Sequence, residues 1–259
     1  MHGDGGQDGT STASGLETDS ASETTEAGEC PGVFSGDLII GEDTNVAEFA
    51  DLGAIEGDLR VLNTTHADLS FLRCLGSVRG AINIAGNENL ETLAGLENLR
   101  SADEIYISSN GSLRSAGALD RLASLEVLWI SDANFFTDIG FNGLEAVDSI
   151  EIGDCGLGPD ELPRGYSPTL TEINGFAKLK EVRVLQIAGH YAIQSLGTLL
   201  DVAPPPGGGA AAFYNNHKLP YAQVQTVLDR FDGFACGNLD DPEPLCSESE
   251  MWPCNIPPP

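Results

Sequence analysis

Residues 82–107 read INIAGNENLETLAGLENLRSADEIYI, and this segment carries a pattern that returns along most of the chain. It begins and ends with an apolar-x-apolar triplet, at residues 82–84 and 105–107. Between the triplets leucine recurs at every third position, at Leu90, Leu93, Leu96 and Leu99. A period of three is neither the 3.6 of an α-helix nor the 2 of a regular strand. It predicts short extended segments joined by tight turns, with every third side chain buried.

The triplet occurs eight times, which identifies a repeat protein. Its copies are residues 38–40, 59–61, 82–84, 105–107, 128–130, 150–152, 185–187 and a degenerate 211–213. Their first positions are separated by 21, 23, 23, 23, 22, 35 and 26 residues. One such unit cannot bury its apolar side alone, so stability must come from stacking each unit on its neighbours. We therefore expect a mainly β fold, a β-solenoid of about eight rungs whose triplets pair as parallel strands.

A second column of residues follows the triplets. Three positions after each triplet lies a mostly polar residue: Asp43, Thr64, Asn87, Asn110, Ala133, Cys155, His190 and Asn216. Asn and Asp accept left-handed backbone and bond to neighbouring main chain, so this column is expected to fasten the turns of successive repeats. Gly36, Gly57 and Gly80 precede three of the triplets and are expected to mark the turns into them.

Two segments interrupt the repeat late in the chain. About 13 residues are inserted at 156–168, and three prolines followed by three glycines occupy residues 204–209. Either segment could bind a ligand, since loops often carry function, or could be a surface excursion that a repeat fold tolerates.

The last repeat is followed by a predicted cap. Pro220 suits the first position of a helix, and the apolar residues Val224, Val227, Leu228 and Phe231 have helical spacing. This helix is expected to close the C-terminal end of the stack. Cys236 and Cys246 enclose a polar acidic loop without a core of its own, and a disulfide between them is expected, which implies an oxidising compartment. Cys74 and Cys155 are expected to be small buried fillers, and the pairing of Cys30 and Cys254 is left open.

These features resemble the receptor L domain, the right-handed β-solenoid relative of leucine-rich repeats found in insulin and growth-factor receptor ectodomains and in bacterial surface lipoproteins. The resemblance rests on Gly-x-Leu-x-Ile followed by Asn-x-x-Leu-x-x-Leu-x-x-Leu, on the opening at residues 30–61, and on the closing segment from Asn215 to Cys246. It implies a non-enzymatic domain that engages a polypeptide on its surface.

Domain organisation follows from composition. Residues 1–29 are rich in acidic residues, Ser, Thr and Gly, a composition that predicts a disordered tether. Residues 30–246 are expected to form the repeat domain with its cap, and residues 247–259 a Pro-rich tail. The leader lacks a secretion signal and a lipidation cysteine, yet its composition matches the tethers of bacterial lipoproteins. A plain disordered leader fits equally well. We expect an extracellular or cell-surface protein whose full precursor could carry a lipid anchor.

Charge excludes several partners. The chain has 40 Asp and Glu against 12 Lys and Arg, a net charge of −28. The base-free segments 1–30 and 232–259 hold 13 of the acids, which leaves −15 on the body between them. Such a chain repels phosphate backbones and anionic bilayers, so nucleic acid is not an expected partner. No apolar run is long enough for a membrane-spanning helix.

No catalytic motif is present, and neither a cofactor nor a metal is expected. The histidines His2, His66, His190 and His217 are scattered, and Asp240, Asp241 and Glu243 lack the spacing of a dedicated calcium loop. Asp58, Glu104 and Glu151 lie on or beside strands and could form the carboxylate pair of a polysaccharide-cleaving enzyme. With so many acids in the chain, solvated surface explains them more simply.

The candidate site is a surface. The middle residue of each triplet points away from the core, which places Arg60, Asn83, Tyr106, Trp129 and Glu151 in one column. Tyr106 and Trp129 occupy consecutive repeats, and adjacent aromatics are typical of recognition patches. We predict a non-enzymatic recognition or adhesion module whose ligand is a protein or a glycan. The alternatives are rings that merely stabilise the sheet in a structural envelope protein, and a carboxylate-dependent enzyme.

Overall fold

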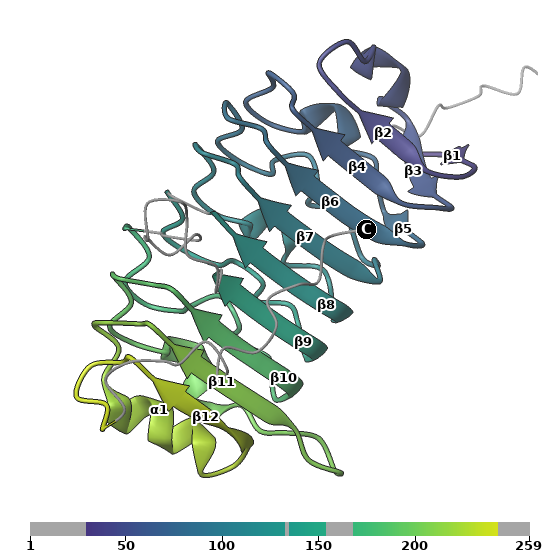
Figure 1. Ribbon diagram of the computed structural model, residues 1–259. Helices are drawn as coiled ribbons and strands as arrows, with labels where there is room; N and C mark the ends of the chain where they lie inside the picture. The colour runs from purple at the N-terminus through teal and green to yellow at the C-terminus, as the bar shows by residue number, and fades with distance from the viewer. Residues whose placement is uncertain (1–29, 133–134, 154–167, 243–259) are drawn as a thin grey trace, which may run out of the picture.

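The computed structural model describes residues 30–132, 135–153 and 168–242 (Figure 1). Within these ranges the chain is mainly β, with one α-helix, α1 (Tyr221–Leu228). The strands are β1 (Gly32–Phe34), β2 (Leu38–Ile40), β3 (Leu52–Ile55), β4 (Leu59–Leu62), β5 (Ser77–Val78), β6 (Ala81–Ala85), β7 (Glu104–Ser108), β8 (Ser124–Ser131), β9 (Ala146–Gly153), β10 (Glu181–Ala188), β11 (Ala210–Tyr214) and β12 (Asp232–Cys236). Short 3-10 helices lie at η1 (Val46–Phe49), η2 (Ser70–Leu72), η3 (Gly117–Leu119) and η4 (Gly197–Asp201).

The strands form two parallel sheets. Nine of the described strands make the large sheet, in the order β12-β11-β10-β9-β8-β7-β6-β4-β2, and the remaining three make a small sheet, β1-β3-β5 (Figure 1). Apart from the strands of the small sheet, each strand pairs with those before and after it in the chain. The pairing register confirms the predicted alignment of the triplets, because their first residues are direct partners: Leu38, Leu59, Ile82, Ile105, Leu128, Ile150, Leu185 and Ala211.

The core lies on one side of the large sheet. The outer residues of each triplet are buried, and so are the leucines of the period-three pattern, such as Leu90, Leu93, Leu96 and Leu99. They belong to one apolar cluster that extends from β2 to α1. Because burying a Leu or Ile side chain contributes roughly 1.5–3 kcal/mol, this continuous core stabilises the stacked repeats.

The late interruptions leave the register intact. Ile150 still pairs with Leu185 across the 35-residue spacing, so the inserted residues do not displace β10 from the sheet. Of the predicted insertion, residues 156–167 lie outside the described residues. In the Pro-Gly segment, Gly207 and Gly208 have φ of +117° and +92°, and nothing lies within 4 Å of where a Cβ would stand. That segment therefore projects from the surface before β11.

The polar column fastens the repeats as predicted. Asn87 donates from Nδ2 to the Val61 carbonyl, and Asn110 donates to the Ile84 carbonyl, in each case one strand back. Asn216 repeats the bond with Ile187. Thr64 and His190 also lie buried in the column, whereas Asp43 is exposed. Ala133 and Cys155 lie outside the described residues, and Asn238, which was not predicted, extends the column beyond Asn216.

His190 is the exceptional member of this column. Its imidazole is 2% exposed and faces the Ile152 carbonyl, but among the described residues neither ring nitrogen reaches hydrogen-bond geometry. Burial lowers the pKa of His190 to about 4, against the weaker opposing effect of the Ile152 carbonyl. The residue is therefore neutral near pH 7.

Two of the predicted turn glycines are required by carboxylates in the preceding repeat. Asp37 accepts a hydrogen bond from the Asp58 N–H, and Asp58 accepts one from Ala81. A Cβ on Gly57 would lie 2.4 Å from Asp37 Oδ1, and one on Gly80 would lie 2.2 Å from Asp58 Oδ1. Glycine leaves room there for the carboxylates to bond to the next strand.

The C-terminal end differs from the expectation in two ways. Pro220 precedes the helix at its N-cap instead of occupying its first turn, while Val224 and Val227 are buried as predicted. In addition, α1 is not the last element, since β12 follows it and pairs with β11 as the ninth strand of the large sheet. The expected count of about eight missed β12 because its sequence, Asp-Gly-Phe-Ala-Cys, lacks the apolar triplet.

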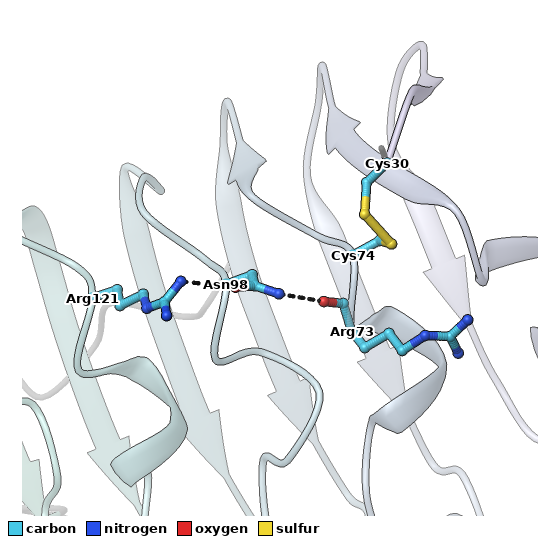
Figure 2. Close-up of a disulfide and its surroundings, with 5 residues drawn as sticks. All are labelled: Cys30, Arg73, Cys74, Asn98 and Arg121. Atoms are coloured by element: carbon cyan, nitrogen blue, oxygen red, sulfur yellow. Dashed lines mark hydrogen bonds between the residues drawn. A yellow bond between two sulfur atoms is a disulfide. The ribbon is translucent and has the colours of Figure 1, made fainter. Parts of the chain in front are cut away.

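A disulfide joins Cys30 to Cys74, which corrects the prediction that Cys74 is a buried filler (Figure 2). The bond links the residue before β1 to the turn before β5 and so ties the two outer strands of the small sheet. Beside it, Arg121 donates to Asn98 Oδ1 and Asn98 Nδ2 donates to the Arg73 carbonyl (Figure 2).

Cys236 is also disulfide-bonded. Its predicted partner, Cys246, lies outside the described residues.

Candidate functional site on the outer face of the large sheet

The candidate residues lie side by side on the face of the large sheet that points away from the core. Register pairs place them in one line across neighbouring strands, which we call the central row: Ile39, Arg60, Asn83, Tyr106, Trp129, Glu151, Gln186, Ala212 and Phe234. The sequence placed Arg60, Asn83, Tyr106, Trp129 and Glu151 in this order, and the register agrees. Neighbours in the row are about 4.8 Å apart along the sheet, so their side chains are in reach of one another.

Tyr106 and Trp129 form the aromatic centre of the row. Their ring centroids are 6.2 Å apart with an interplanar angle of 54°, a tilted contact of the kind that aromatic pairs prefer. Tyr106 is only 5% exposed, whereas Trp129 is half-buried. The expectation of two outward aromatics therefore needs refinement, since Trp129 is the more accessible ring and Tyr106 supports it from the neighbouring strand.

Two carboxylates affect the ionisation of the Tyr106 hydroxyl. Its hydroxyl donates to Glu104 Oε2 at 2.8 Å. Burial, this hydrogen bond and the negative charges of Glu104 and Glu151 together raise the pKa of the phenol well above its ordinary value. Burial also raises the pKa of Glu151, although the hydrogen bond from Ser149 opposes the shift. The site therefore combines aromatic surface with a carboxylate that is protonated more readily than usual.

Asn83 and Arg60 continue the row toward the N-terminus. Asn83 is 7% exposed, and its Oδ1 atom has no hydrogen-bond partner among the described residues. A buried acceptor without a partner costs about 1–3 kcal/mol, and a donor supplied by a ligand would recover that cost. Arg60 pairs with Asp58, the residue just before β4, at 3.2 Å.

Two hollows of the described surface are separate from the central row. They have volumes of about 550 and 470 Å³ and lie elsewhere in the repeat unit. The larger is lined by Glu126, Asp148, Arg183 and Pro205, among others, and the smaller by Val33, Glu56 and Arg79. None of the five candidate residues lines either hollow.

The described residues contain no group of three or more His, Cys, Asp or Glu side chains that could hold a metal ion. In the acidic loop, Asp241 accepts a hydrogen bond from Asn238, Asp240 has a positive φ, and Glu243 lies outside the described residues. No described helix is long and apolar enough to cross a membrane.

Comparison of the chain with protein-family models and with curated proteins finds no match.

Sequence reasoning missed two features of the outer face. At its C-terminal end a second apolar cluster, separate from the core, contains Ala188, Ala212, Tyr214 and Cys236, with Phe234 packed against it. The sequence feature that could have revealed this cluster is a column of mostly small residues two positions beyond the central row. It includes Ala85, Ser108, Ser131, Gly153 and Ala188. Ser149, which bonds to Glu151, was also missed because serine carries no pattern of its own.

Proposed function

We propose that this protein is a non-enzymatic recognition or adhesion module that binds a protein or a glycan through the central row. The observation that carries the proposal is the buried, unpartnered Oδ1 atom of Asn83 in line with the Tyr106–Trp129 pair. An acceptor beside an aromatic platform suits a ligand that offers both a hydrogen-bond donor and an apolar face. Polypeptides and sugar rings both have this combination, and Tyr and Trp are enriched where proteins bind them.

The fold proposed for this module is a right-handed β-solenoid of the receptor L-domain type. The parallel pairing of successive repeats in register supports it, as does the continuous core. In such a fold one side of each repeat remains available for a ligand, and the central row runs along several repeats.

The proposed location is the cell surface or the extracellular space, with the acidic leader as a tether and a lipid anchor on the precursor. The Cys30–Cys74 disulfide supports export, because disulfides persist mainly in oxidising compartments. The net charge of −28 favours solubility and disfavours nucleic acid as a partner.

The test compares binding of the parent chain with that of matched variants. The chains are applied to an array of defined saccharides and to immobilised surface proteins from the source cells, and every bound species is identified. Trp129→Ala and Asn83→Ala should each weaken the same interaction at least tenfold. Phe135→Ala is the control, because Phe135 is an exposed aromatic away from the row. Equal binding by all four chains would show that the row is not the site and would favour a purely structural envelope protein.

A second function, polysaccharide cleavage, is favoured by one observation. Glu151 has a raised pKa while Glu104 lies two strands away, and both carboxylates act on Tyr106. Their backbone positions are offset by two strand spacings and by two residues along the strand, roughly 12 Å in all, whereas the carboxyl groups of inverting glycosidases are about 6.5–9.5 Å apart. The parent chain would then release new reducing ends from neutral or acidic polysaccharides, and Glu151→Gln and Glu104→Gln would each abolish this release. That result would support an enzyme in place of a non-enzymatic recognition module. No release from any polysaccharide by the parent chain would eliminate this function.

A further inference from the structure

The outer face of the large sheet is buried at its C-terminal end. Ala212 is 1% exposed, and Tyr214, whose ring stacks on Phe234, is fully buried. Within the described part of the chain, the apolar cluster here draws only on β10, β11 and β12. Neighbouring strands alone cannot remove an outward tyrosine from solvent, so another group must lie over it.

The described elements do not supply this group. The core covers one face of this sheet. Among the described elements, α1 packs its buried residues into that same core and contributes nothing to the apolar cluster on the outer face. The cover of the outer face must therefore come from elsewhere.

A disulfide indicates which part of the chain covers the outer face. Cys236 belongs to the outer-face cluster, pairs in register with Tyr214, and is disulfide-bonded to a residue outside the described ranges. Two of the three remaining cysteines, Cys246 and Cys254, belong to the segment that follows Pro242. We propose that the outer face is an intramolecular docking surface whose occupant is this C-terminal segment, residues 243–259, tethered through Cys236.

The extent of burial matches the length of this occupant. Central-row positions are buried at Ala212, Gln186, Tyr106 and Asn83, as far as β6, and Ile39 on β2 is 57% exposed. The row members Phe234, Glu151 and Trp129 are partly buried. From β12 to β6 there are six strand spacings, or about 29 Å. With Cys246 as the tethered residue, the 13 residues from 247 to 259 can span up to about 43 Å when extended, which is enough to reach β6.

The docking surface overlaps the candidate site. Tyr106, which is buried at 5% exposure, and Asn83 belong to both. If the proposed function holds, the segment and the ligand compete for this surface. The docking itself does not depend on that function.

Photo-cross-linking of the full, oxidised chain tests the proposal. A photoreactive benzoylphenylalanine replaces Tyr106 in one chain and Phe71, on η2 away from this face, in a matched control. After irradiation, position 106 should be joined to a peptide from 243–259 of the same molecule, and position 71 should not be joined to that segment. Equal mixing of isotope-labelled and unlabelled chains distinguishes the chain's own segment from a second copy.

Cross-links from position 106 only to other segments, to a second copy or to solvent would overturn the docking. A second measurement tests the tether on chains without the photoreactive group. Oxidative footprinting should label Tyr214 at least fivefold more in Cys236→Ser than in the parent, whereas a Cys30→Ser, Cys74→Ser chain should match the parent. Equal labelling in all three would overturn the tether. If the cross-link forms but no ligand binds the row, docking stands and the proposed function fails.

Discussion

The Oδ1 atom of Asn110 accepts two hydrogen bonds from Asn87, one from the backbone N–H at 3.1 Å and one from Nδ2 at 3.0 Å. Asn110 also donates to the Ile84 carbonyl, and its side chain is buried. One side chain thus satisfies both backbone and side-chain groups of the preceding repeat.

Asn110→Ala should therefore destabilise the protein more than an average substitution. It leaves the Ile84 carbonyl and two donors of Asn87 without this partner, and unpaired buried groups cost about 1–3 kcal/mol each before relaxation. We expect a loss of about 3 kcal/mol in the free energy of unfolding measured with urea. Asn45→Ala is the control, because Asn45 is exposed and bonds only to Glu48, and it should change stability by less than about 0.5 kcal/mol. Similar losses in both variants would contradict a special role for the column.

His190 should make stability fall in mild acid. Its pKa is lowered to about 4 in the folded state, so the unfolded state binds the proton first as pH falls below about 6.5. Stability from this residue is complete above pH 6.5 and is lost as pH falls toward 4, by about 3 kcal/mol in total. His190→Asn supplies the residue that the column uses elsewhere. Urea unfolding across this range should show a smaller pH dependence in the variant, and parallel curves would contradict the assignment.

Loss of the Cys30–Cys74 disulfide should loosen the N-terminal repeats selectively. The bond closes a loop of 44 residues, which in the chain-entropy model contributes roughly 4 kcal/mol and in practice about 2–4. A chain with Cys30→Ser and Cys74→Ser should unfold at lower urea concentration. Hydrogen exchange should accelerate in β1, β3 and β5 but not in β9 and β10. Uniform acceleration along the chain would show that the repeats do not respond locally.

Tyr106 should ionise at unusually high pH. Burial and the hydrogen bond to Glu104 raise its pKa, so ultraviolet titration of the folded chain should show a late tyrosine transition whose amplitude is smaller in Tyr106→Phe. Glu104→Gln removes a negative charge and should bring this transition to lower pH. Glu88→Gln, at an exposed position, should leave it unchanged. Since the unfolded phenol ionises near pH 10, stability should also begin to fall above that pH.

The repeat made much of the fold predictable from sequence. The triplets at 38–40 through 211–213 pair in the expected register because each one must bury the same two side chains, and a slip of one residue would reverse them. The Asn column was predictable for a similar reason, since a turn that needs the same bond in each repeat keeps the same residue type.

The features that were missed depend on contacts between distant positions. Cys30 and Cys74 are 44 residues apart, and only the stacking of β1, β3 and β5 brings them together. In β12 Gly233 and Ala235 occupy the inward positions that larger residues fill elsewhere, so its membership of the sheet depends on pairing with β11. The burial of Tyr106 could not be predicted, because the sequence of β7 carries no information about which group lies over the Tyr106 side chain.

The shared register of the large sheet has a consequence for self-association. A tenth strand could join either edge, and β2 of one molecule has the direction needed to continue from β12 of another, which is the start of an open-ended fibre. Asp37 precedes β2 and Asp232 begins β12 at equivalent positions, so such a junction would bring two carboxylates side by side. Their repulsion would oppose this junction at neutral pH, and acid would weaken that barrier to polymerisation.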